Sequence, residues 1–265
     1  MHLVRLLTPL ALLASSATAF SPSPILRPPP SAAAHARRRG DRGATTTTTS
    51  LSMATTLYGS QGSRSPLVNW AANELNLDIA MGDLSKNPHP FGQIPCLVDD
   101  DDDDVVVFES GAILLYLQAK ADGKSAVGDG RSAATASWIA WANASLDPIC
   151  FLETPEGKVY DTGLKSPNKR IAKLDSILSE STYLVPGGFG LADVAVASYL
   201  LYVIQFFPEV DLHGKWPNVV RYMRDCAGRE GYGEAFGKNV QGFCLGRLKE
   251  MEEGGGKDKK LFGMF

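Results

Sequence analysis

Residues 87–98 read Asn-Pro-His-Pro-Phe-Gly-Gln-Ile-Pro-Cys-Leu-Val, and this stretch decides how the first half of the chain folds. Its three prolines and one glycine exclude a helix, because proline lacks a backbone donor and clashes with the preceding turn. Leu97-Val98 begins a strand, the aspartates at 99–104 predict a solvated turn rather than a calcium loop, and Val105–Phe108 is the returning strand. The stretch therefore predicts a β-hairpin that follows a proline-rich loop.

A strand and a helix precede this loop. Thr55–Tyr58 is a short β-prone run, and residues 59–65 form a loop rich in glycine and serine. Ser65-Pro66 predicts a helix start, with the serine as cap and the proline in the first helical position. Asp78–Met81 is a weak strand, so the segment is β-α-β, with a loop where α/β folds place their ligands.

The hairpin leads into a second helix. Glu109-Ser110-Gly111 opens an apolar run, and we expect a helix over residues 112–120. The complete order is β-α-β, a proline-rich loop, and then β-β-α. The fold class we predict for residues 53–122 is therefore an α/β, thioredoxin-like domain.

Three motifs in this order resemble one known family. They are Leu57-Tyr58-Gly59-Ser60 with Ser63-Arg64-Ser65, then Asn87-Pro88 with Gly92-Gln93-Ile94-Pro95, and then residues 108–117, Phe-Glu-Ser-Gly-Ala-Ile-Leu-Leu-Tyr-Leu. One such motif alone is weak, but three in order at plausible spacing are specific. The chain resembles the glutathione transferases over about residues 55–240, and is most similar to serine-type enzymes like those of cyanobacteria.

The resemblance implies a glutathione site with an anion seat at Ser110. This residue lies at a helix N-terminus, where free N–H groups and the helix dipole favour the γ-glutamyl carboxylate. Glu109 would pair with the ammonium group of the same unit. The alternative is that Ser110 only caps its helix.

The proline-rich loop would hold the rest of glutathione. By resemblance, Ile94-Pro95 is a cis peptide that leaves the Ile94 backbone free to pair with the cysteinyl unit. Gln93 or His89 would meet the glycine carboxylate, although His89 is equally well explained as a structural residue of the loop. The short stretch 78–87 implies that the helix which normally follows the second strand is reduced.

A transferase must also stabilise the thiolate of glutathione, because a thiol with a pKa of ~8.5 is mostly protonated at neutral pH. The resemblance places the activating hydroxyl at Ser63, with the charge of Arg64 beside it. Ser60 and Ser65 are nearby alternatives, and Ser65 is more simply explained as the helix cap. Many such families carry a cysteine here for disulfide chemistry, and this chain has none.

The second half of the chain has helical signals, and we predict an all-helical domain over residues 131–247 and a flexible tail over 248–265. Ser166-Pro167 marks one helix start. Residues 191–206 are apolar almost all round and predict a buried central helix, with Gly190 in the cap position. A small hydrophobic electrophile would bind between the domains. The candidate contacts are Trp138, Trp141, Asn143, Phe151 and Tyr160, although most of these are better explained as core residues.

The first 52 residues differ from the rest. Residues 1–19 have a positive start, a short apolar core and a small-x-small end, which is the pattern of a secretory signal peptide. Phe20 follows the expected cut, and residues 20–52 are rich in Ser, Thr, Ala, Pro and Arg, as in a transit peptide. The leader resembles that of algae with complex plastids, so we expect a plastid protein, with secretion as the alternative.

Charge and cysteine usage argue against other classes. Residues 1–52 carry a net +5, and since the whole chain of 265 residues is −3, the remainder is −8 and does not suit a nucleic-acid partner. No stretch after the leader is long and apolar enough to span a membrane. No metal is expected, because the cysteines have no zinc or disulfide spacing and are expected as free thiols; they are Cys96, Cys150, Cys226 and Cys244.

These observations predict a glutathione transferase that passes the thiolate of glutathione to a small electrophile or reduces a peroxide, and that forms a homodimer, as this family usually does. Two alternatives stay open. One is a non-catalytic binding or assembly module, as in the gamma subunit of elongation factor 1B. The other is a thiol oxidoreductase that uses Cys96.

Overall fold

The computed structural model describes residues 55–254, apart from residues 103, 124 and 126. The leader predicted for residues 1–52 lies outside the described residues, and so does most of the predicted tail. Within the described ranges, no helix is both long enough and apolar enough to cross a membrane.

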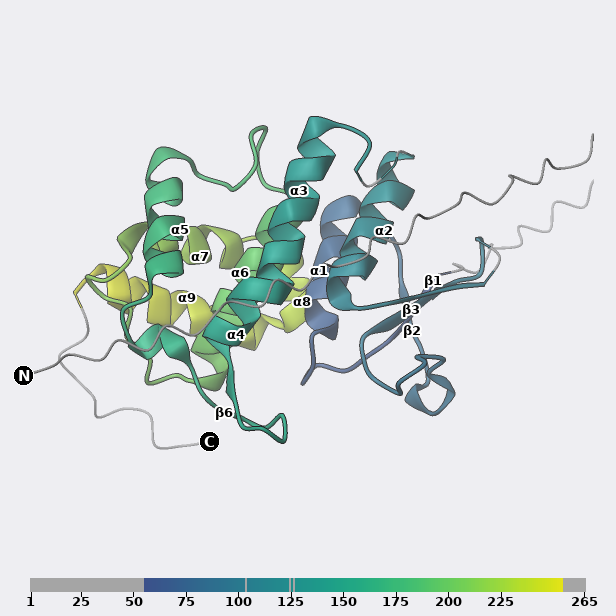
Figure 1. Ribbon diagram of the computed structural model, residues 1–265, viewed down its shortest axis with the longest axis horizontal. Coiled ribbons are helices and arrows are strands. Elements are labelled where there is room, and N and C mark those ends of the chain that lie inside the picture. The colour runs from purple at the N-terminus through teal and green to yellow at the C-terminus, as the bar shows by residue number, and fades with distance from the viewer. Residues whose placement is uncertain (1–54, 103, 124, 126, 255–265) are drawn as a thin grey trace, which may run out of the picture. The chain divides into compact units, whose positions relative to one another are not determined.

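The first half of the described chain is a four-stranded sheet with two helices (Figure 1). The strands, in the spatial order β2-β1-β3-β4, are β1 (Thr55–Tyr58), β2 (Ala80–Met81), β3 (Cys96–Asp99) and β4 (Val105–Phe108). β1 pairs parallel with β2 and antiparallel with β3, which pairs antiparallel with β4. Helices α1 (Ser65–Leu75) and α2 (Ser110–Asp122) pack against each other between the sheet and the helical half. The predicted thioredoxin-like fold is confirmed.

The sheet and its helices share one core. Leu57 and Leu97 are cross-strand partners in β1 and β3, and both are fully buried. Leu67 and Ala71 of α1 and Leu114 of α2 close this core from the helical side. Because truncating a buried leucine to alanine typically costs ~2–5 kcal/mol, this cluster fixes the register of the sheet.

The segment between β2 and β3 is short. It contains the 3₁₀ helix η1 (Leu84–Lys86), which the side chain of Asp83 caps by accepting from the backbone N–H of Ser85 at 3.0 Å. The predicted reduction of the helix in this position is confirmed.

The aspartate-rich turn differs from its prediction at one residue. Asp99 belongs to β3 and is fully buried, instead of starting a solvated turn. The Tyr116 hydroxyl donates to its carboxylate (2.7 Å), and Lys120, one turn further along α2, forms an ion pair with it. Burial alone would raise the pKa of Asp99, but the hydrogen bonds from Lys120 and Tyr116 outweigh burial and lower it. The turn is therefore anchored to α2 by a buried charge.

The second half is built mainly of helices (Figure 1). In chain order these are α3 (Gly130–Trp141), the π-helical η2 (Ala142–Leu146), α4 (Asp147–Cys150), η3 (Gly163–Lys165), α5 (Lys169–Glu180), α6 (Leu191–Phe206), α7 (Pro217–Ala227), α8 (Glu230–Phe236) and α9 (Lys238–Glu252). A hairpin of β5 (Leu152–Glu153) and β6 (Val159–Asp161) interrupts them, and the sequence did not anticipate it. α9 also runs past residue 247, where we expected the domain to end.

Two helix starts differ from their predictions. α1 begins at Ser65 itself, so Ser65 is not its cap. α5 begins at Lys169 rather than at Ser166-Pro167. The side chain of Asn168 accepts hydrogen bonds from two N–H groups of the first turn of α5, and this is a stronger start signal than the serine and proline before it.

Helix α6 is the buried centre of the helical half, as predicted. Every residue from 191 to 204 is buried. Gly190 holds the cap position, and Asp193 accepts a hydrogen bond from its N–H (3.0 Å). The Leu184 N–H (3.0 Å) and the Tyr222 hydroxyl (3.1 Å) donate to the same carboxylate. Asp193 therefore ties the loop before α6 to α7.

Asp193 should make stability depend on pH. Burial raises its pKa from 3.8 to about 6. Because the folded state holds the Asp193 proton more tightly than the unfolded state, this group stabilises the fold at low pH. Its contribution is fully present below pH ~3.8 and is lost as the pH rises through ~6. The stability advantage of the wild type over Asp193→Asn, which cannot titrate, should therefore shrink by about 1 kcal/mol between about pH 5 and 7. Urea denaturation of both proteins measures it, and an advantage that is constant with pH would contradict the assignment.

Candidate functional site

The register of the sheet brings the three predicted motifs to one edge. Tyr58 at the end of β1 pairs with Cys96 at the start of β3, and Cys96 pairs with Phe108 at the end of β4. The loop after β1, the proline-rich loop before β3 and the turn after β4 therefore leave the sheet together. They hold all the predicted site residues: Ser60, Ser63, Arg64, His89, Gln93, Ile94, Pro95, Glu109 and Ser110.

The hydroxyls of Ser63 and Ser65, with the backbone of Ser60, form a hydroxyl cluster after β1. The Ser63 hydroxyl donates to the Ser60 carbonyl (2.8 Å) and accepts from the Ser65 N–H (3.1 Å). The Ser65 hydroxyl lies 2.7 Å from that of Ser63 and accepts from the Ser60 N–H (3.1 Å). Gly59 permits this packing, since a Cβ there would lie 2.0 Å from Ser65 Oγ. Ser65 is buried and Ser63 half-buried, so Ser63 is the hydroxyl that a ligand can reach more easily.

Arg64 is engaged with the helical half. Its guanidinium forms an ion pair with Asp147 and lies over the rings of Tyr199 (5.3 Å) and Phe151 (5.9 Å). Burial alone would lower the pKa of Arg64, but Tyr199 and Asp147 outweigh burial and raise it. Arg64 is therefore charged, and Asp147 balances that charge.

The proline-rich loop has the backbone form that the resemblance implied. The Ile94-Pro95 peptide is cis. His89 is buried and held within its own loop, where its Nδ1 accepts from the Phe91 N–H (3.0 Å) and its ring lies 5.0 Å from that of Phe108. Gln93 is exposed. The loop thus offers a ligand the Ile94 backbone and the Gln93 side chain, while His89 maintains its shape.

The turn into α2 presents backbone donors. Glu109 is the cap residue of α2, and its side chain makes no capping hydrogen bond in the described structure. Glu109 is exposed and has a φ of 69°, which residues other than glycine rarely adopt. Such strain persists where the surroundings impose it, and it gathers at functional sites. An uncapped helix start beside an acidic side chain suits a ligand with both a carboxylate and an ammonium group.

The helical half supports this turn from behind. The Tyr199 hydroxyl on α6 donates to Asn143 Oδ1 (3.1 Å) and also interacts with the Ser110 side chain. A Cβ on Gly111 would lie 2.7 Å from Asn143 Nδ2, so any larger residue there would displace the Asn143 side chain. Contacts between the two halves therefore fix the position of Ser110.

A cavity of ≈ 420 Å³ opens beside Ser63. The loop after β1, the β5–β6 hairpin and its flanking residues, and the end of α6 form its walls. The lining residues are Gly62, Ser63, Arg64, Phe151, Glu153, Val159, Tyr202, Phe206 and Phe207. Ser63 therefore lies where the sheet edge meets this cavity.

The candidates for the second substrate are mostly elsewhere. Phe151 lines the cavity, as expected. Trp138 and Trp141 line a separate groove against α5, because these two residues of α3 project towards that helix. Asn143 and Tyr160 line neither cavity among those described, since Asn143 bonds to α6 and Tyr160 is 62% exposed on β6.

Sequence reasoning missed most of the cavity wall. Tyr202 and Phe206 are one turn apart on α6, and their rings stack 5.8 Å apart. We treated this helix as wholly buried, yet Phe206 is 54% exposed. An aromatic pair at i and i+4 near a helix end is the signal that points to them. Glu153 and Val159 had no such signal, because the hairpin was not anticipated.

Two family models match the chain. The model described as "Glutathione S-transferase, N-terminal domain" matches residues 53–119, and "Glutathione S-transferase, C-terminal domain" matches residues 134–230. The chain belongs to the glutathione S-transferase family. The two matches together cover more than half of the chain, in the order that the sheet and the helical half require.

Known members of the glutathione S-transferase family share this fold. A "Glutathione S-transferase-like protein" from Aspergillus aculeatus is 27% identical over 191 residues, 63% of this chain and 88% of that protein. The glutathione transferase URE2P8 from Phanerochaete chrysosporium, crystallised with oxidized glutathione, has a TM-score of 0.58 at 21% identity, over 73% of this chain and 97% of that one. A theta class glutathione S-transferase from Xanthomonas axonopodis pv. citri, with glutathione bound, has a TM-score of 0.53 at 21% identity, over 70% and 98%. At these identities, the two structures show the fold alone.

Cysteine chemistry has little support among the described residues. Cys96 follows the cis proline and is fully buried. Burial raises the pKa of Cys96, and this disfavours the thiolate that redox chemistry needs. The other three cysteines are also free and buried. Residues 55–254, with the three gaps noted above, contain no group of three or more His, Cys, Asp or Glu side chains that could hold a metal.

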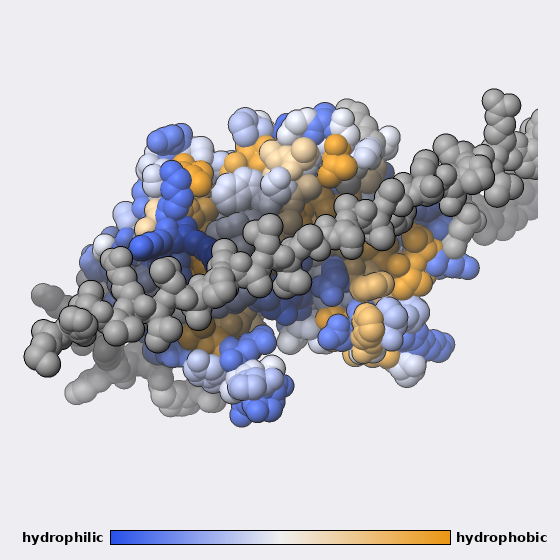
Figure 2. Space-filling model, in the orientation of Figure 1, coloured by the Kyte–Doolittle hydropathy of each residue, from blue (hydrophilic) through white to orange (hydrophobic). Residues whose placement is uncertain are grey.

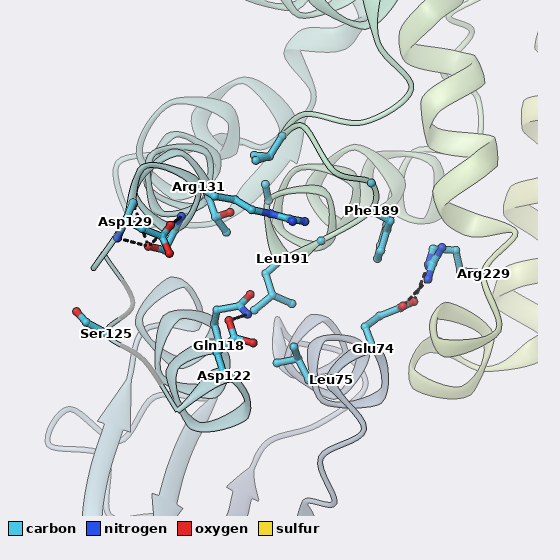
Figure 3. Close-up of a pocket in the computed structure, with 16 residues that line it drawn as sticks. Glu74, Leu75, Gln118, Asp122, Ser125, Asp129, Arg131, Phe189, Leu191 and Arg229 are labelled. Atoms are coloured by element: carbon cyan, nitrogen blue, oxygen red, sulfur yellow. Dashed lines mark hydrogen bonds and ion pairs between the residues drawn. The ribbon is translucent and has the colours of Figure 1, made fainter.

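A second pocket lies at the C-terminal end of α1 (Figure 3). It encloses ≈ 500 Å³ and is lined mostly by polar residues. The ion pair between Glu74 and Arg229 (2.6 Å) forms one side, and Arg229 lies 3.9 Å from the ring centroid of Phe189. The 11 residues of α1, at ~1.5 Å each, separate this pocket from Ser63 by roughly 15 Å. It is a junction between the two halves and shares no lining residue with the cavity at Ser63.

Replacing Glu109 should stabilise the fold. A strained backbone conformation costs ~1–3 kcal/mol, and glycine removes that strain at an entropic cost of ~0.5–1 kcal/mol. Glu109→Gly should therefore raise the free energy of unfolding by about 1 kcal/mol, measured by urea denaturation. Glu156→Gly, at an exposed turn residue with a negative φ, is the control and should not stabilise. Equal effects of the two variants would contradict strain at Glu109.

Proposed function

We propose that this protein is a glutathione transferase in which Ser63 stabilises the thiolate of glutathione. The observation that supports this most strongly is the place of Ser63, at the sheet edge where the three loops meet and on the wall of the ≈ 420 Å³ cavity. A thiol bound along the edge would then face a second substrate in the cavity. The acceptor is a small electrophile with apolar parts, or a hydroperoxide.

The hydroxyl cluster suits this chemistry. Ser63 Oγ accepts a hydrogen bond from the Ser65 N–H and lies within hydrogen-bond distance of the Ser65 hydroxyl. The Ser63 hydroxyl can therefore donate its own proton to a ligand. In the described structure that proton is directed at the Ser60 carbonyl. When the thiolate binds, the hydroxyl rotates and donates to the sulfur, which lowers the pKa of the thiol. The accepted hydrogen bonds polarise the hydroxyl and strengthen this donation.

The rest of glutathione would be held by the other two loops. The N–H groups at the start of α2 and the Ser110 hydroxyl donate to the γ-glutamyl carboxylate, and Glu109 pairs with the ammonium group. The backbone of Ile94 pairs with the cysteinyl unit. Gln93, which is exposed, meets the glycine carboxylate, a role we assign to it rather than to His89, because the Nδ1 of His89 already serves its loop.

The test of this function is Ser63→Ala. Losing one hydrogen bond to a charged sulfur should lower kcat/KM with an aromatic electrophile roughly 10- to 100-fold and raise the apparent pKa of the bound thiol. Glutathione affinity should change little, because the two carboxylates are held elsewhere. Initial rates as a function of pH and calorimetric titration of glutathione measure both effects. Ser179→Ala, an exposed serine on α5, is the matched control.

Other outcomes assign other functions. Glutathione binding without turnover of electrophiles or hydroperoxides would favour a binding or assembly module. Turnover that is unchanged in Ser63→Ala would leave a transferase but overturn the role of Ser63. Activity lost in Cys96→Ser and retained in Ser63→Ala would favour the oxidoreductase.

We also propose a homodimer. The described residues leave two apolar surfaces exposed. One is Phe91, which is 77% exposed on the proline-rich loop, and the other is the ≈ 340 Å³ groove that Trp138 and Trp141 line. Figure 2 shows that separate hydrophobic patches lie between hydrophilic ones on one face of the molecule. A buried aromatic anchor commonly contributes ~2 kcal/mol to an interface.

Phe91→Ser should therefore weaken dimerisation roughly 10- to 30-fold, measured by sedimentation equilibrium. Val127→Ser replaces a residue that is 60% exposed in the segment before α3, and it is the control. A wild type that stays monomeric at about 100 µM would contradict the proposal, because interfaces of obligate homodimers hold far below that concentration.

A further inference from the structure

The β5–β6 hairpin builds one wall of the cavity with a single face. Glu153 and Val159 are register partners in the two strands, and such partners project to the same side of a sheet. The pairing register shifts between Leu152 and Glu153, and Phe151 lies just before β5. Phe151, Glu153 and Val159 all line the cavity. The hairpin therefore presents one carboxylate among apolar side chains to whatever enters.

The charge of Glu153 is not balanced within the cavity. Only two charged side chains, Arg64 and Glu153, are among the lining residues that the structure describes. Arg64 is paired with Asp147, which lies outside the lining. Among the described residues, Glu153 has neither an ion pair nor a hydrogen bond from its side chain. The uncompensated charge of the cavity is therefore negative.

Aromatic rings surround this carboxylate. Phe151 and Phe206 lie 6.1 Å apart, and Tyr202 stacks on Phe206 at 5.8 Å. Aromatic faces attract cations through their quadrupoles, and a carboxylate close by adds to that attraction. The exposure of Phe206 and Val159, at 54% and 42%, is unexplained by the fold and fits a surface that a ligand covers.

From this arrangement we propose that the cavity selects acceptors with an aromatic or apolar reactive part and a positively charged group, such as an alkylammonium, which Glu153 holds. The inference rests on the proposed function and names the class of its second substrate. The thiolate attacks the electrophilic carbon, the carbon–sulfur bond forms, and the leaving group departs with its electron pair. Glu153 takes no part in that exchange and acts on affinity and orientation.

The test compares electrophiles that differ in charge and share one reactive end. The full-length protein is assayed with benzyl chlorides that carry a para trimethylammoniomethyl, neopentyl or carboxymethyl group. The first two have nearly the same shape, and each kcat/KM is divided by the uncatalysed rate with glutathione to remove differences in intrinsic reactivity. The wild type should prefer the cation over the neutral analogue roughly 3- to 10-fold, and added salt should reduce the preference.

The variants assign the preference to one side chain. Glu153→Gln should abolish it, and Glu153→Lys should invert it in favour of the carboxylate. Glu156→Gln, in the turn of the same hairpin and outside the cavity lining, should retain the wild-type preference. A wild type without preference, or a preference that survives in Glu153→Gln, would overturn the inference.

Failure of this inference differs from failure of the proposed function. If neither the three electrophiles nor a hydroperoxide reacts faster with the protein than without it, the transferase proposal fails. The charge preference is then measured as calorimetric binding of benzyltrimethylammonium against benzoate. Tighter binding of the ammonium in the wild type and not in Glu153→Gln supports the cation site, and equal binding of both ions rejects it.

Discussion

The alignment of Tyr58, Cys96 and Phe108 in one row of the sheet is the constraint on which the rest depends. The predicted site residues lie on three loops that are far apart in the sequence, and each loop leaves the sheet next to one of these three residues. A slip of one residue in either pairing would turn a strand over and send its apolar residues to the wrong face. The buried leucines of the core prevent that slip, so the hydrophobic core sets the geometry of the site.

Helix α6, in the helical half, also positions two of these loops. Tyr199 and Tyr202 are three residues apart and therefore lie on one face of this helix. The Tyr202 hydroxyl donates to the Ser63 carbonyl (3.0 Å), and that of Tyr199 interacts with Ser110. Burial raises the pKa of both tyrosines, so their hydroxyls stay protonated as donors. One buried helix thus positions both the loop that holds the proposed thiolate donor and the turn that holds the proposed carboxylate seat.

The sequence predicted what local patterns determine. The four strands of the sheet, the two helices beside them and the buried central helix follow from periodicity and proline content, and the structure confirms them. The reduced connection after the second strand was implied by the family resemblance, and the structure confirms it as well. Prediction from the sequence failed where partners far along the chain determine a residue's environment. Asp99 is an example, because its partners on α2 come 17 and 21 positions later. The hairpin was missed because its strands, Leu152–Glu153 and Val159–Asp161, are too short to show alternation. The predicted roles of the loop residues came from family resemblance and not from periodicity, and they stand as proposals.

Because Arg64 is paired with Asp147, the proposed mechanism depends on two different interactions: a hydrogen bond from Ser63 and the charge of Glu153. The resemblance suggested that its charge helps Ser63 to stabilise the thiolate. In the structure that charge is balanced by Asp147 and packed against Tyr199, so its net field at the sulfur is that of a dipole and not of a cation. In the proposed mechanism, thiolate stabilisation depends on a hydrogen bond from Ser63, which salt hardly screens. The proposed acceptor binding depends on the solvent-exposed charge of Glu153, which salt does screen. Ionic strength should therefore act on the second substrate much more than on glutathione activation, and the same balance makes the proposed preference for cations compatible with an arginine in the cavity wall.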